Sequence, residues 1–248
     1  MYVKFNKPKQ STEETPHDSC QDPDMPVDQN TEIKAMQYDP TYTNGFSTPL
    51  PEIVINEGTL NFRMTARTLW TRYALGMINY SVADLGNLDS AVAVENSMKA
   101  AASACGEYFF PYYGVTAGRK VGSLLTVIGI NGTKVVDAID NNQNIDAYKI
   151  IWSKQIEELA EYLNDLNPTY WPKDLLKDMF INLTDLWTEN FYARKKKDFA
   201  SSAISLDNII KVAVSGQLDG PTMTFSSIAD RLSKGIIAQF PMLFVEKK

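Results

Sequence analysis

The chain is poor in the two side chains that most often serve as catalytic base, thiol nucleophile or zinc ligand, with one histidine and two cysteines. Its one histidine, His17, lies near the start of the 248 residues, so the rest of the chain has no imidazole base for a serine or cysteine nucleophile. The same absence excludes the Glu-x-x-His pairs of di-iron helical bundles. Two distant cysteines, Cys20 and Cys105, do not make a zinc site or a disulfide framework. We therefore expect no catalytic residue, no cofactor and no zinc or iron.

Long apolar runs and concentrated positive charge are also missing. No stretch of about eighteen apolar residues occurs, so no membrane span is expected. The first ten residues, MYVKFNKPKQ, lack the apolar core of a classical secretory signal. The net charge is -6, and residues 1–58 account for all of it, with four lysines and ten acidic residues. The remaining residues are electrically balanced, which argues against a nucleic-acid partner.

The composition divides the chain into an arm, residues 1–58, and a body, residues 59–248. The arm holds seven of the twelve prolines and few aliphatic side chains, so it cannot bury enough apolar surface to fold alone. We expect it to extend along a neighbouring subunit or along its own body, two alternatives that the sequence leaves open. Its expected partner-contact residues are apolar: Ile33, Met36, Tyr38, Tyr42, Phe46, Leu50, Ile53, Val54 and Ile55. The run Ile53–Ile55 predicts a short strand.

The body has the apolar periodicity of helices. Trp70, Tyr73, Ala74 and Met77 follow the spacing i, i+3, i+4, i+7, and Gly86 is a suitable helix end. Further helices are predicted to begin near Asp89 or Ser90 and near Thr116, Asn144, Pro172 and Asp198, with an interruption at SGQLDGP before a last segment that stops at Pro241. Long helices with short connections predict an all-α, up-and-down antiparallel bundle.

The stretch FFPYYGVTAG, residues 109–118, lies between two of these helices. Pro111 ends one helix, Gly114 is able to take a positive φ, and Thr116 is able to cap the next. Gly118 and Gly122 on one face would let a second helix approach closely. We interpret the stretch as a tight corner rather than a ligand loop.

A second hypothesis is a helical bundle that binds a small ligand or a metal. Its pocket would lie at a bundle end, near Arg72, Asp84, Tyr112 and Tyr113. Two carboxylate pairs at helical spacing, Asp137 with Asp140 and Asp185 with Glu189, leave a Mg²⁺ or Ca²⁺ site open. Such pairs are more often solvated surface.

Four segments in order resemble the landmarks of a poorly characterised helical-bundle family of bacteria and large DNA viruses. They are LWTRYAL, PYYGVTAG, WSKQIEELAEYLNDLNPTYWP and ADRLSKGIIAQFP, within residues 60–241. The family sometimes carries a glycosyltransferase label that its sequences do not justify. The resemblance implies one all-helical domain without an established activity.

This chain departs from the resembled family in two ways. Bacterial members have several histidines on their helix faces, and this body has none. It also has the acidic arm. We therefore expect a non-enzymatic structural protein: a subunit or cementing component of a larger assembly, with a virion minor capsid role as its most specific form. The expected partners are other protein subunits reached through the arm, and the expected location is the virion or the cytoplasm.

Overall fold

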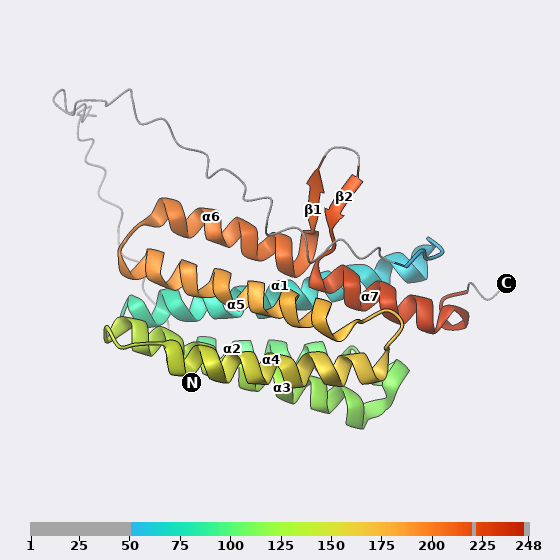
Figure 1. Ribbon diagram of the computed structural model, residues 1–248, viewed down its shortest axis with the longest axis horizontal. Helices are drawn as coiled ribbons and strands as arrows, with labels where there is room; N and C mark the ends of the chain where they lie inside the picture. The colour runs from blue at the N-terminus through green and yellow to red at the C-terminus, as the bar shows by residue number, and fades with distance from the viewer. Residues whose placement is uncertain (1–50, 220–221, 246–248) are drawn as a thin grey trace, which may run out of the picture. The chain divides into compact units, whose positions relative to one another are not determined.

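The computed structural model describes residues 51–219 and 222–245, and Figure 1 shows their arrangement. The predicted all-α bundle is confirmed. The described residues form seven α-helices: α1 (Glu57–Leu85), α2 (Ala91–Glu107), α3 (Phe110–Asp140), α4 (Asp146–Leu166), α5 (Lys173–Lys195), α6 (Phe199–Ile210) and α7 (Ile228–Gln239). The apolar arm residues from Ile33 to Leu50 lie outside the described part.

Local capping chemistry fixes several helix starts. Asn56 precedes α1, where its Oδ1 accepts a hydrogen bond from the backbone N–H of Thr59 at 2.9 Å, and the Thr59 hydroxyl accepts one from the Asn56 N–H at 2.9 Å. This capping box places the helix start two residues before the boundary predicted at residue 59. Ser90 and Asp198 precede α2 and α6 as predicted, whereas Pro172 is the residue before α5 rather than its first helical residue.

The helices form two groups in space. In Figure 1, α1, α5 and α6 run side by side, with α2, α3 and α4 along the lower part of the view. Consecutive helices from α1 to α6 run in alternating directions, as the up-and-down prediction requires. The last helix, α7, continues in the direction of α6 and contacts α1 near the end of the bundle where α1 begins.

A small hairpin interrupts the path from α6 to α7. A π-helix, Lys211–Ser215, follows α6 and leads to Gly216, whose φ is +66°. The strands β1 (Gln217–Asp219) and β2 (Thr222–Phe225) then pair antiparallel, with Leu218 opposite Met223. The interruption predicted at SGQLDGP is thus a hairpin. The strand predicted at Ile53–Ile55 is wrong, because these residues have no regular structure.

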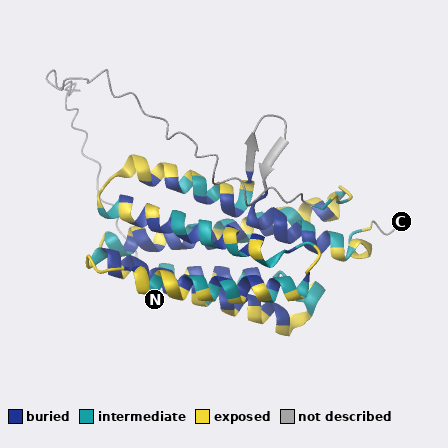
Figure 2. Ribbon diagram, in the orientation of Figure 1, coloured by how far each residue is buried: buried dark blue, intermediate teal, exposed yellow. Residues whose placement is uncertain are grey.

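The core lies between the helices and includes all four tryptophans of the chain. Figure 2 shows buried residues on the sides of the helices that face one another. Trp70, Trp152, Trp171 and Trp187 are each at most 3% exposed. The indole N–H of Trp152 donates to the carbonyl of Ile128 at 2.8 Å, and that of Trp187 to Ala74 at 3.2 Å. Their polar atoms are satisfied inside the core, as expected of packing residues.

Candidate functional site

The aromatic stretch that begins α3 forms a corner of packed rings. Gly114 has a φ of +82° and a ψ of 164°, which kinks the chain between a first turn and the long part of α3. The ring of Tyr112 stacks on Phe244 with centroids 5.7 Å apart, and Tyr113 lies edge-on to Phe240 at 5.3 Å. Tyr113 also packs against Trp171 at 5.7 Å. These contacts support the corner interpretation, but Pro111 lies in the first turn of α3 rather than at the end of a helix, and α3 begins at Phe110 rather than at Thr116.

Two hydroxyl groups of the corner have partners within the protein. The Tyr113 hydroxyl donates to Oε1 of Gln239, and the Tyr108 hydroxyl donates to the carbonyl of Phe62 at 3.1 Å. Burial raises the pKa of Tyr112, Tyr113 and Tyr108 above the ordinary value of tyrosine. Burial thus disfavours the phenolate form of all three, and their rings pack against neighbouring aromatic side chains.

The four residues of the predicted pocket lie at different places in the bundle. Arg72 and Asp84 are twelve residues apart in α1, a rise of about 18 Å. Tyr112 instead contacts Phe62, near the beginning of the same helix, with ring centroids 5.2 Å apart. The structure does not bring the predicted set of four together.

Asp84, Asp137 and Asp140 form a group of carboxylates near the end of α1, which we call the acidic corner. The Tyr80 hydroxyl donates to Oδ1 of Asp137 at 3.2 Å. Burial, and then the charges of Asp137 and Asp140, raise the pKa of Asp84. Lys195 offsets part of this charge through its ion pair with Asp140 at 2.5 Å. No group of three or more His, Cys, Asp or Glu in the described part of the chain is arranged to hold a metal ion.

The second predicted carboxylate pair also meets a lysine. Nζ of Lys149 lies 3.4 Å from Oδ1 of Asp185. Partial burial, and then the charge of Asp185, raise the pKa of Glu189. This pair lies on a partly solvated helix face, as the surface interpretation predicts.

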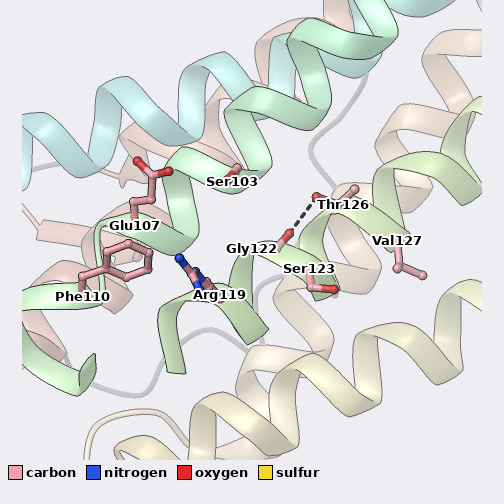
Figure 3. Close-up of a pocket in the computed structure, with 8 residues that line it drawn as sticks. All are labelled: Ser103, Glu107, Phe110, Arg119, Gly122, Ser123, Thr126 and Val127. Carbon is pink, nitrogen blue, oxygen red and sulfur yellow. Dashed lines mark hydrogen bonds between the residues drawn. The ribbon is translucent and has the colours of Figure 1, made fainter. Parts of the chain in front are cut away.

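A surface hollow of about 370 Å³ lies between α2 and α3. Figure 3 shows Glu107 from α2 and Arg119 from α3 near the ring of Phe110, with Thr126 bonded to the carbonyl of Gly122. Glu107, Arg119 and most of the other lining side chains are exposed to solvent. The hollow is open to solvent, and neither Tyr112 nor Tyr113 lines it.

Exposed apolar side chains gather where α1 begins. The side-chain amide of Asn56 donates to the carbonyl of Phe244 at 2.6 Å, which joins the segment before α1 to the segment after α7. Five large apolar residues that are 60–80% exposed flank this bond, and we call them the apolar end: Val54, Ile55, Met242, Leu243 and Val245. Two of them, Val54 and Ile55, are among the predicted partner-contact residues.

A basic cluster lies on α1 and α7 near the apolar end. Asp230 is fully buried, and its carboxylate accepts hydrogen bonds from Arg63 at 2.8 Å and from Arg67 at 2.9 Å. Arg231 and Lys234 belong to the same charge group. The basic cluster is therefore Arg63, Arg67, Arg231 and Lys234; Asp230 pairs with Arg63 and Arg67, and Arg231 is itself buried. Sequence reasoning missed it, since 167 residues separate Arg63 from Asp230 and no local pattern links them.

Comparisons with protein-family models, curated proteins and solved structures gave no match. The resemblance to the helical-bundle family therefore stays a prediction. Among the described residues, no helix has both the length and the apolar character needed to cross a membrane. The candidate functional surfaces of the described part are therefore the two near the start of α1, the apolar end and the basic cluster.

Proposed function

We propose that this chain is a non-enzymatic assembly protein, a subunit or cementing component of a larger complex. The observation that carries the proposal is the exposure of the apolar end. Val54 and Ile55 are 74% and 71% exposed, and Met242 is 80% exposed. Contiguous exposed apolar side chains at one end of a folded domain are typical of a protein-protein contact.

The position of the apolar end supports the role proposed for the arm. Residues 1–50 lead directly into the segment that carries Val54 and Ile55. A partner that covers the apolar end would also meet this arm, whose composition suits ordering on another surface. A virion minor capsid protein is the most specific form of the proposal, and the resemblance to a family that includes viral members supports it.

The small-ligand alternative has less support. The rings of Tyr112 and Tyr113 pack against Phe240, Phe244 and Trp171. They line neither the hollow between α2 and α3 nor a second hollow along α1. The geometry therefore favours a binding surface over a binding pocket.

Two substitutions at the apolar end test the proposal. The variant V54S/L243S removes two exposed apolar side chains without changing charge, and we expect it to reduce assembly of the full-length chain. Sedimentation velocity over a range of protein concentrations measures the loss. The matched control is V92S/I150S, because Val92 and Ile150 are 70% and 58% exposed on other helices.

A deletion of residues 1–50 is the second variant in this experiment. We expect the truncated chain to lose assembly as V54S/L243S does. If the apolar-end variant and the truncated chain both assemble like the full-length protein, or if the full-length protein is a monomer at every concentration and with every candidate partner, the proposal fails.

A further inference from the structure

The apolar end is too small to form a stable interface by itself. It has five exposed side chains, whereas each partner in a stable protein-protein interface contributes about 20–30 residues. In Figure 1, α1 begins and α7 ends at this same end of the bundle. A stable complex at this end therefore needs further residues next to the apolar end.

The exposed side of α1 extends the apolar surface. Leu60 and Met64 are 45% and 65% exposed and lie one helical turn apart, a rise of about 6 Å, and we call them the apolar stripe. Beside Met64 is a hollow of about 380 Å³ that Thr68, Thr71 and Arg72 also line. A thioether, threonine methyl groups and the stem of an arginine pack well against an aromatic ring. The stripe and the hollow thus suit an extended segment with aromatic side chains.

Residues 33–50 of the chain have this chemistry. They hold six large apolar side chains, and one of these stands at every fourth position from Tyr38 to Leu50. The segment has one lysine and one aspartate, so it is electrically balanced, unlike the acidic residues before it. Eighteen such residues, added to the apolar end and the apolar stripe, bring the share of one copy into the range that a stable interface needs.

The segment joins the body at the surface that it would cover. Leu50 directly precedes Pro51, which lies three residues before Val54. Thr48 and Leu50 each precede a proline, which favours extended backbone at both positions and disfavours an immediate return to the same surface. Eighteen extended residues span about 60 Å, which is enough to reach the same end of a facing molecule. A second copy is therefore a better acceptor than the chain's own body.

We propose that residues 33–50 of one copy bind the apolar end and the apolar stripe of a second copy, whose own residues 33–50 bind the first copy in the same way. This inference rests on the proposed function, because it names the partner of the apolar end. Each copy gives and receives a segment at the same end of its bundle. The contact is therefore isologous, and a two-fold symmetric dimer closes it.

Complementation between two full-length variants tests the exchange. The arm variant Y42S/F46S and the surface variant V54S/L243S should each raise the concentration at which half of the chains dimerise by at least about tenfold, as expected for side chains at the centre of an interface. A mixture of the two variants joins an intact arm to an intact apolar end, so it should dimerise better than either variant alone. Energy transfer between donor-labelled and acceptor-labelled chains measures the mixed dimer.

Matched controls separate this contact from general loss of apolar surface. The variant M25S/V27S removes two apolar side chains from the acidic part of the arm and should dimerise normally. Outside the apolar end, M64S should weaken dimerisation severalfold, whereas V92S, at a 70% exposed position of α2, should not. Far-ultraviolet circular dichroism verifies the fold of each variant.

Photo-crosslinking locates the contact in the full-length chain. A photoreactive phenylalanine analogue replaces Phe46, and chains with and without a heavy-isotope label are mixed before irradiation. Mass spectrometry should then find crosslinks between chains of different mass, from position 46 to residues 54–64 or 240–245.

Three results would overturn the inference. The first is crosslinks confined to single chains, which would show that the segment covers its own body. The second is dimerisation of Y42S/F46S equal to that of the unchanged chain. The third is a mixture that dimerises no better than the separate variants. If V54S/L243S loses assembly and Y42S/F46S does not, the proposed function stands and this inference fails.

Discussion

At the scale of single residues, Asp230 is a fully buried carboxylate with two arginine partners. These are Arg63 and Arg67 of α1, which bond to it directly. The backbone N–H of Asp230 also donates to the hydroxyl of Ser227, which precedes α7. Asp230 therefore joins the start of α7 to the first turns of α1.

We predict that D230N lowers the free energy of unfolding by about 2–4 kcal/mol. The amide leaves both arginines without a charged partner, and the cations around it then repel one another. Urea denaturation measures the change. The control D185N removes a 40% exposed carboxylate whose lysine lies 3.4 Å away, and its effect should stay within about 0.5 kcal/mol. A loss of similar size in both variants would contradict the prediction.

At the acidic corner we expect the loss of a carboxylate to raise the free energy of unfolding, whereas D230N lowers it. Burial and neighbouring acids raise the pKa of Asp84 above its ordinary value of 3.8, so the folded chain binds this proton more tightly than the unfolded chain. Its contribution to stability therefore falls as pH rises from about 4 through the folded-state pKa. We predict that D84N stabilises the fold by about 0.5 kcal/mol at pH 7 and by less at pH 4.

Thermal unfolding of D84N at the two pH values tests this sign. Asp198 provides the contrast, because hydrogen bonds from Ser201 lower the pKa of its carboxyl. The variant D198A should destabilise the fold at pH 7, with an effect that shrinks as the pH falls through the folded-state pKa. If D84N destabilises the fold at pH 7, the charge repulsion inferred at the acidic corner is wrong.

At the scale of elements, close helix contact explains the glycines of α2 and α3. A Cβ built on Gly106 would lie 2.4 Å from the carbonyl oxygen of Gly118 and 2.8 Å from the Cα of Gly122. These are backbone atoms, so a side chain at Gly106 must push the two helices apart. The prediction that Gly118 and Gly122 allow a close approach is confirmed.

We predict that G106A costs about 1–3 kcal/mol of stability, the usual penalty for overpacking. The matched control is G58A in the first turn of α1, where the nearest atom to a new Cβ is Oδ1 of Asn56 at 3.4 Å. Because alanine favours a helix over glycine, G58A should be neutral or stabilising by up to about 1 kcal/mol. Calorimetry measures the stability of both variants. If G106A is as stable as the parent chain, the two helices separate at little cost and the prediction is wrong.

The sequence predicted the helices better than it predicted their contacts. Gly86 and Asp198 mark helix ends through local chemistry, which acts over a few residues, whereas Ser90 precedes α2 without a side-chain capping bond. The strand prediction at Ile53–Ile55 failed because β-branched residues form a strand only where a neighbouring strand pairs with them.

The functional surfaces were harder to predict for the same reason. The basic cluster and the apolar end each join residues from opposite ends of the body, which only the packing of α7 against α1 brings together. The predicted pocket was wrong because it grouped residues by their chemistry. Arg72 and Asp84 lie about 18 Å apart along α1, so they do not line one pocket. Local patterns thus predicted the fold class, and tertiary contacts determine the candidate surfaces.

At the scale of the whole molecule, folding and assembly separate into different parts of the chain. The buried apolar core runs from Ala66 to Ile237, and the capping box that begins α1 depends on Asn56 and Thr59. The bond from Asn56 to Phe244 closes the same end. All of these residues lie after residue 50, so the bundle has its own core and its own caps.

We therefore predict that a chain without residues 1–50 keeps the fold of the bundle while it loses assembly. Its melting temperature should lie within about 4 °C of that of the monomeric full-length chain, since a change below about 1 kcal/mol shifts a domain of this size by no more than that. The comparison uses V54S/L243S as the full-length monomer, which removes the stabilising effect of assembly itself. A fall of 10 °C or more, or a loss of helical circular dichroism, would show that the arm is part of the fold, and the separation between a folding body and an assembling arm would then be wrong.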